Sequence, residues 1–90
     1  MAVGRLERDP DVLVAEVEGR PLLLNVRTWT YLSFNETGAR IWHHLEEPRG
    51  RAELLERLTG EFEAPEAEIA ADLDLFLAEL REQGFLLDAQ

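Results

Sequence analysis

The two histidines, His43 and His44, are the side chains in this sequence best suited to proton transfer or metal binding, and they are adjacent. On a helix, adjacent side chains point about 100° apart, whereas a helical metal pair needs a spacing of three or four residues. We therefore expect a surface or partly buried structural role for both. The only serine, Ser33, lacks the glycine-flanked turn that exposes a catalytic serine, so we interpret it as a cap at a strand end.

Acidic side chains are abundant, but nothing marks any of them as a catalytic pair. The sequence has no cysteine, which excludes disulfides, thiolate metal ligands and cysteine nucleophiles. It has no glycine-rich phosphate loop either. We therefore expect a protein that is not an enzyme and that holds neither a metal ion nor a cofactor. One expected helix carries a set of acids that a solvated face explains: Glu66, Glu68, Asp72, Asp74, Glu79 and Glu82.

The net charge is −10 and is concentrated in the second half of the chain. Eight acids and six arginines give −2 for residues 1–50, and eleven acids and three arginines give −8 for residues 51–90. Such a surface repels phosphate backbones and anionic lipid headgroups, so we expect neither a nucleic-acid nor a membrane partner. The charge fits solubility alone as well as a preference for a basic partner. The lack of cysteine staples and of a signal peptide favours the cytoplasm.

The length suits one small domain, which we expect to span residues 1–90, with strands over about 12–34 and helices over about 36–84. β-Branched, aliphatic and aromatic residues gather in three short runs. Turn signals separate the runs, so we expect an antiparallel three-stranded sheet. The runs are residues 12–17, 22–26 and 29–34.

From residue 35 the apolar period changes from two residues to about 3.6, which predicts three helices. Asn35 is a candidate N-cap for the first helix, and Ser33 with Glu36 forms a rival capping box. Pro65 suits the first turn of the third helix, and Gly84 suits its end. The expected core stripes are Ala39, Ile41, Trp42 and Leu45; Leu54, Leu55, Leu58 and Phe62; and Ile69, Leu73, Phe76, Leu77 and Leu80.

The expected fold is therefore α+β and winged-helix-like, with a three-stranded antiparallel sheet followed by three helices. Many winged helices bind DNA through the third helix. Here the segment 66–83 carries six acids and only Arg81, a charge of −5. Because phosphate neutralisation supplies most nonspecific DNA affinity, we expect no DNA binding.

The third expected strand has an unprotected edge, because residues 29–34 include no lysine and no proline. Such an edge can bind an extended peptide by strand addition, or it can be covered by a terminus or a second copy; both possibilities stay open. On the third helix, Leu75 lies outside the core arc, where it suits a groove wall or is simply an exposed leucine. The strand is expected to turn Thr30, Leu32 and Phe34 toward the helices and Trp29, Tyr31 and Ser33 away from them.

A recurring set of residue types occurs in both halves of the chain, around the end of the third strand and along the third helix. The third strand ends in an apolar residue and an Asn, followed by a Gly and an Ile-Trp pair; the third helix shows Asp-apolar, Phe-Leu, Leu and then Gly-apolar-Leu. With these positions, residues 12–87 resemble the PqqD-like family, the precursor-recognition elements of ribosomal peptide natural-product pathways. One departure is Arg49-Gly50, where an acid is expected before the glycine. The pattern consists of Phe34, Asn35, Gly38, Ile41, Trp42, Asp72, Leu73, Phe76, Leu77, Leu80, Gly84, Phe85 and Leu86.

The resemblance implies a non-catalytic protein that captures the leader of a precursor peptide as an added strand, in the groove between the third strand and the third helix. It looks most like the lasso-peptide version, whose partners would be a leader peptidase and a macrolactam-forming enzyme. The alternative is a PqqD-type peptide chaperone for a radical enzyme in quinone-cofactor or other modified-peptide maturation. Asp72, Asp74 or Glu79 could pair with a basic leader residue. The implied peptide-binding residues are Trp29, Thr30, Tyr31, Leu32, Ser33, Asp72, Leu73, Leu75, Phe76 and Glu79.

Overall fold

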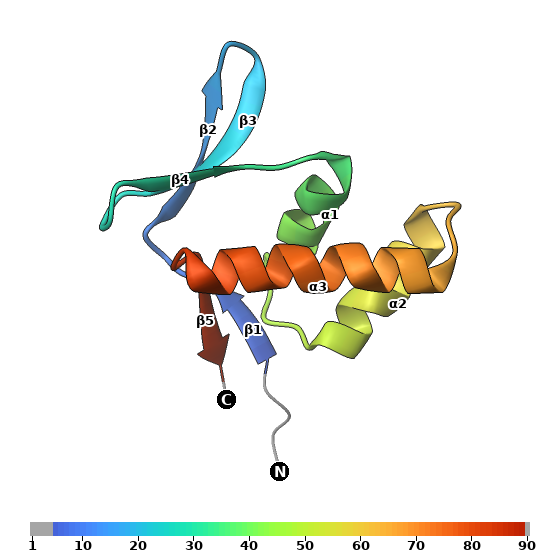
Figure 1. Cartoon of the computed structure of the whole chain (residues 1–90). Helices are drawn as coiled ribbons and strands as arrows, with labels where there is room; N and C mark the ends of the chain where they lie inside the picture. Colours follow the sequence, from blue (N-terminus) through green and yellow to red (C-terminus); the bar gives the residue numbers. More distant parts are fainter. Residues whose placement is uncertain (1–4, 90) are drawn as a thin grey trace.

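The structure, a computed structural model, describes the main chain of residues 5–89 and the side chains of residues 5–87. Its main sheet has three antiparallel strands in the order β2 (Val12–Val17), β3 (Arg20–Asn25) and β4 (Thr30–Ser33) (Figure 1). Glu18 and Gly19, at φ 52° and 78°, make the tight turn between β2 and β3, because hairpin turns with two left-handed residues match the twist of the strands. The expected meander is confirmed.

The third strand of this sheet is shorter than residues 29–34. Trp29 adopts a left-handed φ of 57° and closes the turn by donating its backbone N–H to the carbonyl of Asn25 over 2.8 Å. Phe34 lies beyond the strand, next to the cap of the following helix. The prediction of strand structure at Trp29 and Phe34 was therefore wrong, because aromatic β-propensity yields to the turn at one end and to the helix cap at the other.

Three helices follow the sheet: α1 (Glu36–His44), α2 (Arg51–Glu61) and α3 (Glu66–Glu82). The Asn35 side chain accepts a hydrogen bond from the backbone N–H of Gly38 over 2.9 Å, which makes Asn35 the N-cap of α1. Of the two candidate caps, Asn35 is thus the one the structure uses. Within the described residues, no helix is long and apolar enough to cross a membrane.

Gly84 ends α3, as expected, in the left-handed conformation at φ 84°. The backbone N–H of Phe85 donates to the carbonyl of Leu80 over 2.7 Å, and that of Gly84 donates to Arg81 over 3.3 Å. These two bonds define a Schellman motif. The motif turns the chain sharply, so that Phe85 is fully buried beneath the helix that precedes it.

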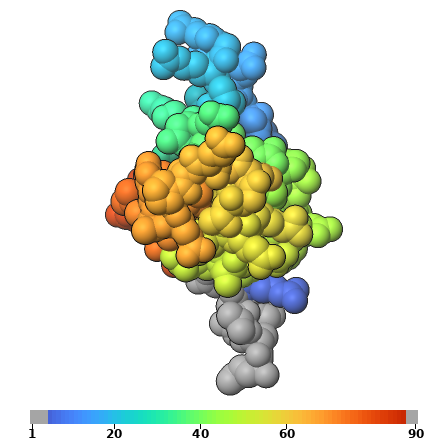
Figure 2. Space-filling view, turned by 90° about the vertical axis from the view of Figure 1, so that its right-hand side faces the viewer, coloured from blue at the N-terminus to red at the C-terminus, as the bar shows by residue number. Residues whose placement is uncertain are grey.

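A second, two-stranded sheet was not expected from the sequence. It pairs β1 (Arg5–Arg8) with β5 (Leu86–Ala89) in antiparallel fashion, with Leu6 opposite Asp88. An antiparallel bridge between Leu6 and Arg49 ties β1 to the segment between α1 and α2. β1 and β5 therefore lie side by side below α3 in Figure 1, whereas the β2–β3 hairpin stands out on the opposite side of the helices (Figures 1 and 2).

The core lies between the inner face of β3 and β4 and the three helices. Leu23 of β3 is completely buried there, and Leu32 and Val12 pack against the margin of the core. All the residues expected on the helical stripes are buried or partly buried, which confirms the helical periods. The fully packed members include Ile41, Leu45, Leu54, Leu58, Leu73, Leu80 and Phe85.

Candidate functional site

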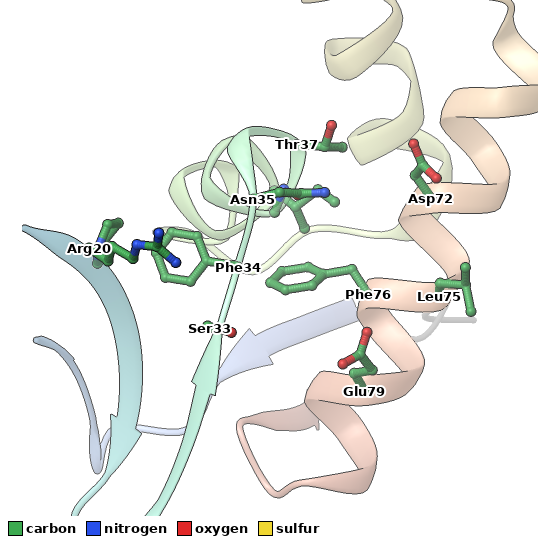
Figure 3. Close-up of a pocket in the computed structure, with 12 residues that line it drawn as sticks. Arg20, Ser33, Phe34, Asn35, Thr37, Asp72, Leu75, Phe76 and Glu79 are labelled. Atoms are coloured by element: carbon green, nitrogen blue, oxygen red, sulfur yellow. The ribbon is translucent and has the colours of Figure 1, made fainter. Parts of the chain in front are cut away.

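A groove of about 470 Å³ opens between the end of β4, the start of α1 and the exposed side of α3 (Figure 3). It collects side chains that are far apart in the sequence, from β3 through α3. Its floor is apolar and its α3 wall carries acidic groups, so it suits an elongated ligand with both apolar and basic parts. The lining residues are Arg20, Pro21, Ser33, Phe34, Asn35, Thr37, Gly38, Ile41, Asp72, Leu75, Phe76 and Glu79.

The floor of the groove depends on a glycine in α1. A Cβ atom on Gly38 would lie only 2.9 Å from the Cβ of Phe34 and 3.1 Å from the Cε1 of Phe76. These distances are too short for carbon atoms in contact. The absent side chain at Gly38 is therefore what lets the two phenylalanines approach α1 and form one apolar surface.

Asp72, Phe76 and Glu79 lie on the side of α3 that faces β4, whereas Leu75 lies at the outer margin of this wall, turned away from the Phe76 ring (Figure 3). Leu75 is 66% exposed although it is a large apolar residue. This leucine is one of the residues that line the groove, and its contact with a peptide stays a prediction.

The outer edge of β4 runs beside this wall. Within the part of the chain that the structure describes, β4 pairs with β3 alone, so its other edge has no strand partner. The chain direction of β4 is opposite to that of α3 along the groove (Figures 1 and 3). An unpaired edge next to an apolar groove offers backbone hydrogen bonds and side-chain contacts to the same ligand.

Half of the expected site residues line the groove, namely Ser33, Asp72, Leu75, Phe76 and Glu79. The others lie around it or beneath it. Thr30, Tyr31 and Leu32 lie on β4 beyond the groove, and Trp29 lies in the preceding turn. Tyr31 and Trp29 are 70% and 75% exposed. Leu73 is completely buried, so it supports the wall from the core.

Sequence reasoning missed the contribution of β3 to the groove. Arg20 and Pro21 line it because Leu22 pairs with Ser33, which brings the start of β3 next to the end of β4. No local sequence signal marks this proximity. For the other missed positions a signal existed, because Phe34, Asn35, Gly38 and Ile41 belong to the family pattern; Thr37 had none.

Several charged groups of the helices are paired inside the protein. The guanidinium of Arg51 donates two hydrogen bonds to Asp74, at 2.6 and 2.9 Å, and holds the pKa of this carboxyl below its usual value. Asp74 lines a smaller pocket with Arg51 and does not line the groove.

A second cluster joins α1 to α2. Arg40 donates two hydrogen bonds to Glu61, at 3.1 and 2.9 Å, and the buried His44 contacts the same carboxylate through Nε2 at 2.8 Å. The Arg40 hydrogen bonds, helped by His44, lower the pKa of Glu61 to about 2. His43 is exposed at the surface. Among the described residues, no group of three His, Cys, Asp or Glu side chains could hold a metal ion.

Comparison with known proteins agrees with this geometry. The family model described as coenzyme PQQ synthesis protein D (PqqD) matches residues 22–86. The chain belongs to the PqqD family. The match begins in β3 and ends at the start of β5. It therefore contains every residue that lines the groove except Arg20 and Pro21. The resemblance seen in the sequence is thereby confirmed.

Two solved structures resemble this PqqD-family chain over nearly its whole length. One is TbiB1 in complex with the TbiA(beta) leader peptide, which is 28% identical, with a TM-score of 0.75 over 89% of this chain and 93% of that chain. The other is lasso peptide synthetase B1 complexed with the leader peptide, 27% identical, with a TM-score of 0.74 over 91% and 96% of the two chains. No curated protein matches the sequence.

Proposed function

We propose that this PqqD-family protein binds the leader of a ribosomally made precursor peptide as an extra strand on the open edge of β4. The observation that carries the proposal is the position of the groove, which lies directly beside that edge and is floored by Phe34 and Phe76. Both similar solved structures contain a leader peptide, which supports the same class of ligand here.

In this proposal the edge of β4 binds the peptide backbone, and the groove binds its side chains. Main-chain hydrogen bonds to β4 fix the register of the peptide without reading its sequence. Side chains of an extended peptide alternate between two faces, so every second one turns toward α3 and meets Leu75 and Phe76. An antiparallel added strand runs in the same direction as α3, because β4 and α3 run in opposite directions.

The protein acts by binding alone in this proposal. A separate leader peptidase and a macrolactam-forming enzyme then process the captured precursor in the cytoplasm, as in lasso-peptide biosynthesis. The similarity to lasso peptide synthetase B1 favours these partners. The family description, coenzyme PQQ synthesis, favours a second candidate, in which the partner is a radical enzyme that modifies the bound peptide.

Binding of a precursor peptide, taken from the same gene cluster if the cluster encodes one, tests the proposal. Its leader, made synthetically with a fluorescein label, is titrated with the protein and with the variants Tyr31→Ala, Asp72→Ala and Leu75→Ala. These side chains are exposed, so their truncation should leave the fold intact. At least one variant is expected to bind about tenfold more weakly, or ~1.4 kcal/mol.

Glu56→Ala is the matched control, because Glu56 is exposed on α2 and does not line the groove. Circular dichroism first establishes that each variant is folded. If the three groove variants bind the leader as tightly as the parent and the control, the groove is not the binding site. If the parent itself does not bind the leader, the proposed function is wrong.

A further inference from the structure

Two carboxylates on α3 stand at opposite ends of the groove's apolar wall. Asp72 and Glu79 both line the groove, with Leu75 and Phe76 between them (Figure 3). They are seven residues apart, so they are separated by about 10.5 Å along the helix axis and by only about 20° around it. The groove therefore has two negative points at a fixed spacing on one side.

Asp72 and Glu79 differ from three other acids, which the protein pairs with arginines. Asp74 and Glu61 are each bonded twice to an arginine, and Asp9 is bonded to Arg27. Within the described side chains, neither Asp72 nor Glu79 makes an ion pair. The arginine that lines the groove, Arg20, lies across from them on β3 (Figure 3).

The spacing of the two carboxylates is closer to four residues of an extended peptide than to two. Side chains that face α3 recur every second residue, or about 6.8 Å. Positions i and i+4 are then about 13.6 Å apart, and long basic side chains need to lean inward by only about 1.5 Å each to reach carboxylates about 10.5 Å apart. Position i+2 falls midway, opposite Leu75 and Phe76. Basic residues at i and i+2 would be only about 6.8 Å apart, and no side chain between them would face Leu75 and Phe76.

We propose that the groove selects a leader segment with the pattern basic, any, apolar, any, basic, and that Asp72 and Glu79 are its specificity-determining residues. The inference rests on the proposed function and specifies the peptide that the same site takes. In an antiparallel added strand, Asp72 reads the N-terminal basic residue and Glu79 the C-terminal one. Each exposed pair is expected to strengthen binding by about 1.4- to 5-fold, and added salt weakens this gain.

Selection from a displayed library of random dodecapeptides tests this pattern, because the library samples every arrangement of basic and apolar residues. The parent protein is expected to enrich peptides with an apolar residue and with Lys or Arg two positions before and two positions after it. Asp72→Lys should convert the preference at the N-terminal position to Asp or Glu, and Glu79→Lys should do so at the C-terminal position. The apolar preference should survive both changes.

Glu56→Lys is the control, because it makes the same charge change on α2 outside the groove and should leave the enriched pattern unaltered. Circular dichroism establishes that all three variants are folded. Enrichment of apolar peptides without a basic preference, or a preference that both charge reversals leave unchanged, overturns this inference and leaves peptide binding intact. If no peptide is enriched on the parent protein, both the inference and the proposed function are overturned.

Discussion

The side-chain amide of Asn25 donates a hydrogen bond over 2.9 Å to the backbone carbonyl of Gly84, 59 residues away in the chain. Its Oδ1 atom accepts from the backbone N–H groups of Arg27 and Thr28, at 2.9 and 3.3 Å. Asn25 is completely buried at the end of β3. It therefore ties the turn that leads into β4 to the end of α3, and so joins the two walls of the groove.

Replacing Asn25 by alanine removes this connection and leaves three backbone groups without their partner. Because an unsatisfied buried polar group costs about 1–3 kcal/mol, Asn25→Ala should lower the free energy of unfolding by at least that amount. Urea denaturation measures the change. Val26→Ala, at an exposed position of the same turn, should stay within about 0.5 kcal/mol of the parent. Equal stability of the two variants would show that the Asn25 contacts contribute nothing.

Two glycines should respond to alanine in opposite directions. Gly84 has a φ of 84°, which strains any residue with a Cβ, so Gly84→Ala should destabilise the fold by about 1–2 kcal/mol. Gly60 lies in α2 with open space around its Cα, so Gly60→Ala should stabilise the fold by about 0.5–1 kcal/mol. Thermal unfolding followed by circular dichroism separates the two effects. A stabilised Gly84→Ala protein would rule out the left-handed end of α3.

Gly38→Ala should damage the groove more than the fold. The new methyl group would meet the Cβ of Phe34 and the ring of Phe76, and both must move to accept it. Such overpacking costs about 1–3 kcal/mol, partly offset because alanine favours a helix by up to about 1 kcal/mol. We expect a folded variant whose affinity for the leader falls at least fivefold in fluorescence anisotropy. Unchanged affinity would mean that the phenylalanine floor does not contact the peptide.

Acid should weaken the contact between α1 and α2 through Glu61. Its pKa in the folded protein is about 2, below the ordinary value of 4.5. The ionised carboxylate therefore stabilises the fold above the unfolded pKa, and this contribution is lost as the pH falls from about 4.5 through about 2. Glu61→Gln should be less stable than the parent at pH 7 and should show a flatter loss of stability across that interval.

Urea unfolding at several pH values between 7 and 2 measures this difference. Glu63→Gln is the control, because Glu63 is exposed and takes part in none of the ion pairs of the described residues. It should follow the parent at every pH. If Glu61→Gln also follows the parent, the Arg40–Glu61–His44 cluster does not stabilise the fold.

The parts of the fold with local patterns could be read from the sequence, and those built from distant pairings could not. Apolar periods located all three helices, and Gly84 marked the end of α3. The β1–β5 sheet was missed because residues 5–8 alternate charges around a single leucine and pair with a segment some 80 residues away. A four-residue strand of this kind gains its stability from the partner, not from its own propensity.

The residues of the candidate site also fall into those that a local pattern predicts and those that depend on distant pairing. Helical geometry placed Asp72, Leu75 and Glu79 on one side of α3, and these three line the groove. Leu73 was also expected at the peptide, but it points into the core, since its direction on the helix matches the buried stripe. Arg20 lines the groove because of the register of β3 against β4, and no local sequence pattern predicts this register.

A nuclear magnetic resonance titration of the ¹⁵N-labelled protein with the synthetic leader tests strand addition at β4 most directly. The amide signals of Thr30–Ser33 and of α3 residues 72–79 should shift together and saturate, and the β4 amides that become hydrogen-bonded should exchange more slowly with solvent. The amides of β2, on the other edge of the sheet, should change little. Shifts confined to Val12–Val17, or none at saturating leader, would contradict peptide binding at the β4 edge.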